Sequence, residues 1–167
     1  RAHSWFPSYG SPDRSPYAAI YTSLGCPFKC SFCMINSINR DDNRPDWSAA
    51  DSAKIRYFSP GRIVKELGWL GSRGIKTVRF SDEMFFMNPK HYVPLLEMIR
   101  QWFSDSFNLW AYARGDTVKP CNLDLFRSAG VRWLALGIES ANKAVRKNAS
   151  KGSYGDTDVR RVVKQIQ

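Results

Sequence analysis

The sequence has no long apolar run. Nowhere in its 167 residues does a stretch approach the roughly 20 apolar residues that a membrane-spanning helix needs. The opening residues, RAHSWFPSYG, also lack the apolar core of a secretory signal. These two absences argue against a membrane span and against secretion, so we expect a cytoplasmic protein.

Acidic residues are comparatively few. The chain has 15 acidic and 25 basic residues, for a formal net charge of +10. A basic balance can indicate a nucleic-acid partner. The basic residues are scattered along the chain, however, as on an ordinary solvated surface. Charge therefore leaves nucleic-acid binding open without favouring it.

Cysteine is also scarce, yet three of the four cysteines stand together in the segment GCPFKCSFC, at Cys26, Cys30 and Cys33. At ~3.3–3.6 Å per extended residue, such short gaps let the three thiols converge on one compact group. A disulfide would leave one of the three thiols over, and no secretory signal accompanies them. The pattern therefore favours a metal group.

The number of clustered thiols limits which metal groups the segment can hold. A structural zinc site normally takes four ligands, and an electron-transfer cluster takes four thiolates. The fourth cysteine, Cys121, is far along the chain, and His3 and His91 have no ligand-like spacing. Three thiolates would instead leave one iron of a [4Fe–4S] cluster open to a substrate or cofactor. Three incidental buried cysteines are the alternative, which their density disfavours.

Four segments have the apolar, β-branched character of strands: Ala18–Ser23, Ile75–Ser81, Asn108–Ala113 and Val131–Ile138. The last is almost continuously apolar, as expected of a parallel strand that is buried on both faces. Each is followed by a helical segment. The sequence therefore predicts an α/β fold with a parallel sheet and right-handed crossovers.

The helical segments have recognisable ends. Ser59 and Asn88 each precede a proline, which is a typical helix start. A short helix over Asn122–Ser128 is stopped by Gly130, and the last residues of the chain place valines at helical spacing. The first strand-to-strand gap is nearly twice the others, and its excess, Gly25–Phe58, follows a strand's carboxyl end. Because α/β folds carry their chemistry at those ends, we expect the site there.

The CxxxCxxC motif after a first strand, with aromatic Phe32 before the last cysteine, resembles the radical S-adenosylmethionine (radical SAM) superfamily. The resemblance implies that Cys26, Cys30 and Cys33 hold a [4Fe–4S] cluster whose open iron binds the amino and carboxylate groups of S-adenosylmethionine. It also implies a low-potential electron donor of the flavodoxin or ferredoxin type. Reductive cleavage would then give methionine and a 5′-deoxyadenosyl radical.

Three further strand ends resemble motifs of the same family. RFSDEMF makes Asp82 and Glu83 candidates for the methionyl ammonium. AYARGD makes Arg114 a candidate for the methionyl carboxylate. GIES makes Glu139 and Ser140 candidates to face the cofactor. The alternatives are a carboxylate that caps a turn, a surface arginine, and a serine that is only the N-cap of the next helix.

The family fold is a six-strand partial barrel, whereas four strands are counted here. The resemblance thus implies a partial (β/α) TIM-like barrel with about four of the usual six βα units. We expect residues 1–17 to be a lead-in or linker from a missing upstream domain, and residues 18–167 to be the N-terminal two-thirds of the core domain. The chain starts with Arg rather than Met, so we read it as part of a larger protein and expect it to be inactive alone.

The segments SPYAAIYTSLGCPFKCSFC, RYFSPGRIVKEL and SDEMFFMNPK resemble the subgroup whose core follows a cobalamin-binding domain. This implies cobalamin bound by a missing upstream domain, methyl transfer as one possible reaction, and a small-molecule, lipid, sugar or natural-product substrate. The first alternative is a tRNA-modifying, methylthiotransferase-like radical SAM enzyme. An alternative of another class is a non-catalytic iron–sulfur or zinc-binding module.

Overall fold

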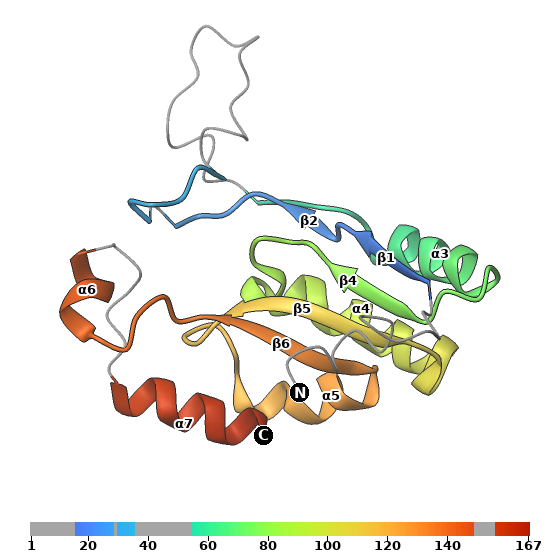
Figure 1. Cartoon of the computed structure of the whole chain (residues 1–167). Coiled ribbons are helices and arrows are strands. Elements are labelled where there is room, and N and C mark those ends of the chain that lie inside the picture. The colour runs from blue at the N-terminus through green and yellow to red at the C-terminus, as the bar shows by residue number, and fades with distance from the viewer. Residues whose placement is uncertain (1–15, 29, 36–54, 149–155) are drawn as a thin grey trace, which may run out of the picture.

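The structure, a computed structural model, describes residues 16–28, 30–35, 55–148 and 156–167 (Figure 1). Its main sheet has the strand order β1-β4-β5-β6, and every neighbouring pair is parallel. The strands are β1 (Tyr17–Ile20), β4 (Thr77–Phe80), β5 (Asn108–Arg114) and β6 (Val131–Gly137). The predicted α/β class and parallel sheet are therefore confirmed.

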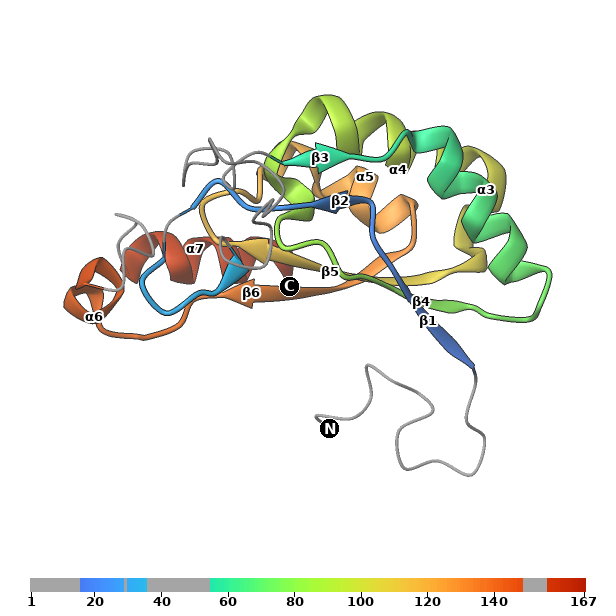
Figure 2. The ribbon, with the colours of Figure 1, turned by 90° about the horizontal axis from the view of Figure 1, so that it is seen from above.

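Helices connect the parallel strands, as the predicted alternation requires. Figure 2 shows α3, α4 and α5 together on one side of the sheet. The α-helices are α3 (Pro60–Gly71), α4 (Pro89–Phe103), α5 (Leu123–Ser128), α6 (Lys143–Asn148) and α7 (Asp156–Ile166). Single 3-10 turns are η1 (Phe85–Met87), η2 (Ser104–Ser106) and η3 (Pro120–Asn122). No helix among the described residues is long and apolar enough to cross a bilayer.

Two helices begin where the sequence predicts. Asn88 caps α4, because its side chain accepts a hydrogen bond from the backbone N–H of Lys90. Ser59 occupies the N-cap position of α3, where Pro60 supplies the first turn without a side-chain cap bond. In α3 the buried residues are Ile63, Val64, Leu67 and Leu70.

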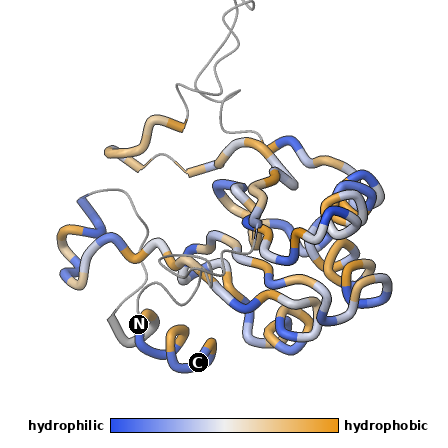
Figure 3. The backbone as a smooth tube through the Cα atoms, turned by 45° about the vertical axis from the view of Figure 1, so that its right-hand side comes forward, coloured by the Kyte–Doolittle hydropathy of each residue, from blue (hydrophilic) through white to orange (hydrophobic). Residues whose placement is uncertain are grey.

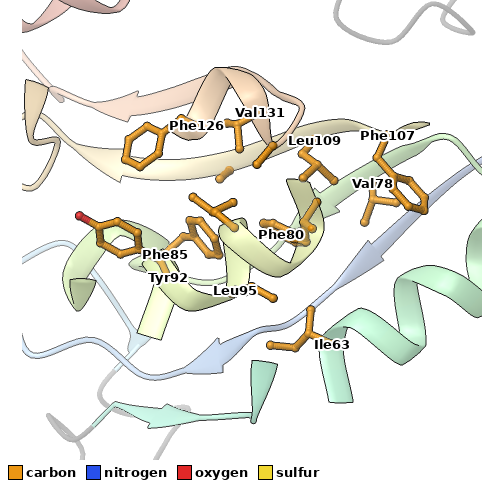
Figure 4. Close-up of a cluster of buried hydrophobic side chains, with 14 of the residues drawn as sticks. Ile63, Val78, Phe80, Phe85, Tyr92, Leu95, Phe107, Leu109, Phe126 and Val131 are labelled. Atoms are coloured by element: carbon orange, nitrogen blue, oxygen red, sulfur yellow. The ribbon is translucent and has the colours of Figure 1, made fainter. Parts of the chain in front are cut away.

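The core lies between the sheet and helices α3, α4 and α5, and it is rich in aromatic rings (Figure 4). Phe86 packs against Phe126 with ring centroids 4.2 Å apart, and Phe80 stacks on Phe85 at 4.9 Å. These contacts link η1 to both β4 and α5. Because only residues 81–84 separate β4 from η1, the core also fixes the short backbone segment that carries Asp82 and Glu83.

Gly130 lets the start of β6 approach the start of β5 closely. Its φ is +86°, and a Cβ there would lie 2.5 Å from the backbone oxygen of Phe107. The carbonyl of Gly130 accepts a hydrogen bond from the N–H of Leu109 at 2.8 Å. Only glycine accepts both this left-handed backbone and this close approach. The predicted helix stop is therefore also the point where two neighbouring strands are aligned.

The first predicted strand is wrong in its length. Residues 18–23 were expected to form one strand, but β1 ends at Ile20 and the chain then enters a second, antiparallel pair. That pair joins β2 (Ser23–Leu24) to β3 (Arg56–Tyr57). The break leaves Thr22 and Ser23 pointing their polar groups at the end of β4. The predicted lead-in at 1–17 and much of the long segment 25–58 lie outside the described residues.

Candidate functional site

The carboxylate of Asp82 is buried at the carboxyl end of β4 and binds the chain that leaves β1. It accepts hydrogen bonds from the backbone N–H of Thr22 at 2.6 Å, the hydroxyl of Thr22 at 2.5 Å and the hydroxyl of Ser23 at 2.6 Å. Burial raises the pKa of Asp82, and the bonds from Ser23 and Thr22 oppose that rise. Asp82 therefore works as an anchor between two strand ends.

Glu83 reaches the residue just before the first cysteine. Its Oε2 accepts a hydrogen bond from the backbone N–H of Gly25 at 3.0 Å, and the side chain is half-buried. Neighbouring carboxylates thus have different surroundings. Asp82 is enclosed by its donors, whereas Glu83 lies at the edge of the cysteine segment, which we define as residues Gly25–Ile35 without residue 29.

His91 extends the polar contacts of Asp82 into α4. The side chain is buried, its Nε2 lies 3.3 Å from Thr22 Oγ1, and its ring centroid is 4.6 Å from that of Tyr57. When Thr22 gives its single hydroxyl hydrogen to Asp82, His91 must donate from Nε2. Burial lowers the pKa of His91, which favours the neutral ring. The sequence offered no spacing that assigned His91 a role.

Arg114 ends β5 and is only 3% exposed, which rules out a surface arginine. Its Nε and Nη2 donate to the two oxygens of Asp116 at 2.9 and 2.7 Å. The guanidinium carbon lies 3.7 Å from the ring centroid of Phe28. Its Nη1 lies 3.9 Å from the sulfur of Cys30. Arg114 therefore connects the end of β5 to the cysteine segment at two places.

The three clustered cysteines differ in exposure. Cys26 is buried, Cys30 is half-buried, and Cys33 is exposed. A turn joins the last two, because the backbone N–H of Cys33 donates to the carbonyl of Cys30 at 3.1 Å. Cys26 belongs to a small apolar cluster with Ile35 and Met84. Figure 3 shows hydrophobic residues on this segment, at the edge of the molecule.

The thiols lie close enough to influence one another electrostatically. Burial raises the pKa of Cys26, and negative charge on Cys30 and Cys33 raises it further, while a backbone bond at Phe28 and the charge of Arg114 lower it. Within the described ranges, no three His, Cys, Asp or Glu side chains are already gathered as a metal-binding group. Three cysteine thiols, which bind metal as thiolates, nevertheless lie beside a cation and an apolar cluster and form a donor set that suits an iron–sulfur cluster.

The remaining predicted residues lie on the cysteine segment and after β6. Phe32 is 54% exposed. Glu139 is exposed and has a left-handed backbone, with φ +66°. The Ser140 hydroxyl accepts from the N–H of Asn142 at 3.0 Å, and Asn142 in turn accepts from the N–H of Ala144 at 2.8 Å. The N-cap of α6 is thus Asn142, which removes that alternative for Ser140.

A buried arginine supports the same turn. Arg146 of α6 donates from Nη1 to the carbonyl of Ser140 at 2.7 Å and to that of Ala141 at 2.9 Å. The structure therefore brings Glu83 and Arg114 into direct contact with the cysteine segment, and Asp82 into contact with Thr22 and Ser23, just before that segment. It places Glu139 and Ser140 at the carboxyl end of β6, the strand next to β5. Asp116, Phe28 and His91 are contacts that the sequence did not reveal.

Comparison with known proteins gives relatives of the kind expected. An uncharacterised methyltransferase of Pyrococcus horikoshii is 28% identical over 141 residues, which are 84% of this chain and 28% of that protein. The anaerobic magnesium-protoporphyrin IX monomethyl ester cyclase of Synechocystis is 28% identical over 83% of this chain and 26% of its own length. The cobalamin-dependent radical SAM methyltransferase TokK of Streptomyces tokunonensis is 28% identical over 74 residues, 44% of this chain and 9% of TokK.

Solved structures show the same fold. The radical S-adenosylmethionine methyltransferase TsrM from Kitasatospora setae, solved with tryptophan substrate and a SAM analogue, matches 90% of this chain and 28% of TsrM. The TM-score is 0.71 at 21% identity. The four-strand sheet therefore has the fold of part of TsrM, and the chain spans no more than 28% of any of these proteins. The sequence profile of the radical SAM superfamily matches residues 20–166. The chain belongs to the radical SAM superfamily.

Proposed function

We propose that this chain holds a [4Fe–4S] cluster on Cys26, Cys30 and Cys33 and binds the methionyl end of S-adenosylmethionine beside it. The observation that carries the proposal is the set of contacts joining the cysteine segment to the ends of two strands, β4 and β5. Glu83 bonds Gly25, and Arg114 contacts both Cys30 and Phe28. When bound, the cluster supplies the electron that cleaves the sulfonium, and the protein supplies ligation and orientation.

Glu83 is the better candidate for the methionyl ammonium. The carboxylate of Asp82 already accepts three hydrogen bonds inside the protein and is fully buried. Glu83 is half-buried, and its Oε2 accepts a bond from Gly25, the residue before Cys26. A carboxylate at that place can accept a charge-assisted bond from an ammonium. Asp82 then positions the loop from which Gly25 and Cys26 extend.

Arg114 is the candidate for the methionyl carboxylate. Asp116 takes the Nε–Nη2 edge of the guanidinium, and the Nη1 side faces the cysteine segment. Nη1 carries two N–H groups, so it can donate to a carboxylate as well as toward Cys30. Phe32, Glu139 and Ser140 stay candidates for further contacts to the cofactor.

For the whole protein we propose a cobalamin-linked methyl transfer to a small-molecule substrate. The support is that the relatives include a cobalamin-dependent radical SAM methyltransferase, and that TsrM was solved with cobalamin and a [4Fe–4S] cluster. In this proposal residues 18–167 are the N-terminal two-thirds of the core, an upstream domain binds cobalamin, and a flavodoxin or ferredoxin supplies electrons. A tRNA methylthiotransferase and an inert metal module are the competing functions.

The test is anaerobic reconstitution of the full-length protein. We expect about four irons and four sulfides per chain, an EPR signal that changes when S-adenosylmethionine is added, and cleavage of the cofactor under reduction. Cys30→Ala should remove the intact cluster, whereas the matched control Cys121→Ala should keep it. If a reduced, fully loaded cluster neither cleaves S-adenosylmethionine nor changes its EPR signal when the cofactor is added, the radical SAM function is refuted and the non-catalytic metal module is favoured. Cobalamin binding would separate methyl transfer from the tRNA-modifying function.

A further inference from the structure

Two side chains hold the guanidinium of Arg114, one at its edge and one on its face. Asp116 binds one edge of its guanidinium with two hydrogen bonds, at 2.9 and 2.7 Å. Phe28 covers the planar face, 3.7 Å from the guanidinium carbon to the ring centroid. The side chain is 3% exposed, so water screens its charge little. A bidentate pair in such surroundings fixes the direction of the remaining N–H groups.

That direction is toward one of the cysteines. Nη1 of Arg114 lies 3.9 Å from Cys30 Sγ, within hydrogen-bonding range of a sulfur acceptor. A thiolate is a better acceptor than a thiol because it is charged. Hydrogen bonds and charges around the sulfurs are among the factors that set the reduction potential of an iron–sulfur cluster. A donor aimed at a ligand sulfur therefore affects the cluster without touching iron.

We propose that Arg114 donates a hydrogen bond from Nη1 to the Cys30 thiolate of the cluster and so favours the reduced state, with Asp116 and Phe28 as its positioning residues. This inference rests on the proposed function, because it requires a cluster on Cys30. Reduction adds one electron and no bond changes at Arg114. A fixed positive charge beside the sulfur stabilises that added negative charge, so the midpoint potential is higher with Arg114 than without it.

The molecule offers a matched control pair. Arg132 also forms a salt bridge with an aspartate, Asp105, at 2.6 Å, but both side chains are exposed. This pair joins the start of β6 to η2, far along the strands from the cysteine segment. Arg132→Met removes the same charge and the same kind of pair as Arg114→Met. It tests whether the potential responds to net charge alone.

The experiment is an EPR-monitored redox titration of the full-length, reconstituted protein without S-adenosylmethionine. We expect Arg114→Met to lower the equilibrium constant for one-electron reduction about tenfold, which is a fall of about 59 mV. Asp116→Asn should lower the potential in the same direction and add nothing in the double variant. Arg132→Met should leave it unchanged. Proton ENDOR after exchange into D2O should show a coupled exchangeable proton that Arg114→Met removes.

The possible failures can be told apart. Iron content and the EPR signal of each variant show whether its cluster has loaded, and Arg114→Lys supplies a second variant that keeps the charge but lacks the fork. If the parent protein assembles no cluster, the proposed function itself fails. If the cluster assembles and responds to S-adenosylmethionine, but Arg114→Met and Arg114→Lys keep both the potential and the coupled proton, this inference alone is wrong. A rise in potential for Asp116→Asn would show that Asp116 acts through its own charge and not by positioning Arg114.

Discussion

The sheet with its helices and the cysteine segment are stabilised in different ways. The sheet and helices share one continuous apolar core, in which Phe80, Phe85 and Leu95 are fully buried. The cysteine segment contributes Cys26 and Ile35 to a small cluster with Met84, and several of its described side chains are exposed. Hydrophobic burial therefore stabilises the sheet and its helices. Directed polar bonds from Glu83 and Arg114 locate the cysteine segment, and Asp82 anchors the chain that leads into it.

This difference between the two regions indicates that the stability of the fold and the geometry of the site depend on separate residues. Apolar contacts are non-directional, so they make a compact sheet without deciding where a thiol points. Hydrogen bonds are directional, and those of Glu83 and Arg114 join the cysteine segment to the ends of β4 and β5. Substitutions should therefore divide into those that unfold the protein and those that leave it folded but displace the cysteine segment.

Phe85→Ala tests the core and should have the largest effect. The ring is buried and packs edge-on against Phe86, with centroids 4.7 Å apart. Removing it should lower the free energy of unfolding by about 3–5 kcal/mol, measured by urea denaturation. Phe32→Ala, which removes the exposed ring of the cysteine segment, is the control and should change that free energy little. Equal losses would show that the two regions are not stabilised separately.

Asp82→Ala tests the polar anchor. It leaves the N–H and hydroxyl of Thr22 and the hydroxyl of Ser23 without their buried acceptor, at a cost of about 1–3 kcal/mol in unfolding free energy. Cluster loading should fall as well, because the loop that leads to Cys26 loses its attachment. Glu83→Ala should reduce the response to S-adenosylmethionine while the cluster still loads. If Asp82→Ala leaves iron content untouched, the anchor does not position the cysteines.

The pH dependence of stability should carry a contribution from His91. Its pKa is lowered from 6.5 in the folded state, so the unfolded chain binds more protons between the two values. Stability from this residue is present above pH 6.5 and is lost as the pH falls. Through this residue the free energy of unfolding changes by at most about 1.4 kcal/mol per pH unit. Asp82 contributes with the opposite sign, since its raised pKa lets the folded state keep a proton as the pH rises above 3.8.

Urea denaturation of the parent protein and of His91→Gln between pH 5.5 and 7.5 isolates the contribution of His91 to the pH dependence. Asp82 is present in both proteins, so its contribution cancels in the comparison. The parent should lose more stability than the variant toward the acid end. Identical slopes would mean that His91 is protonated in the folded state as readily as in the unfolded chain.

The exposed Arg132–Asp105 pair should give the smallest effect. Both side chains are in contact with water, and pairs of this kind contribute about 0–1 kcal/mol. Asp105→Asn should therefore change the unfolding free energy by no more than that, and less at high salt. A loss comparable to that of Asp82→Ala would show that exposure is a poor guide to the strength of the polar contacts.

Local patterns predicted the parts of the fold that depend on local chemistry. Asn88 before a proline marks the start of α4, and the apolar run at 131–138 marks β6. The β2–β3 pair could not be foreseen, because Arg56 and Tyr57 are both exposed and carry no alternation. A similar limit applies to Asp82 and Glu83: both belong to one motif, and only tertiary burial shows which of them is enclosed.

The missed site residues depend on contacts between distant parts of the chain. Phe28 and His91 have no motif of their own, since their partners are Arg114 and Thr22. Asp116 had a local signal in AYARGD, where it follows Arg114 by two residues. Superfamily and fold were predicted from the spacing of a few motifs, and the comparisons confirm both. The roles of individual side chains stay predictions.

The contacts of the cysteine segment also set an order of assembly. Gly25 and Glu83 are 58 residues apart in the chain, and Cys30 and Arg114 are 84 apart. During synthesis from the N-terminus the three cysteines leave the ribosome first, but their attachment points follow much later. The segment can reach its folded position only after β5 has been made and paired. Iron that arrives earlier would meet thiols with no arginine beside them, so cluster insertion should follow folding of the sheet.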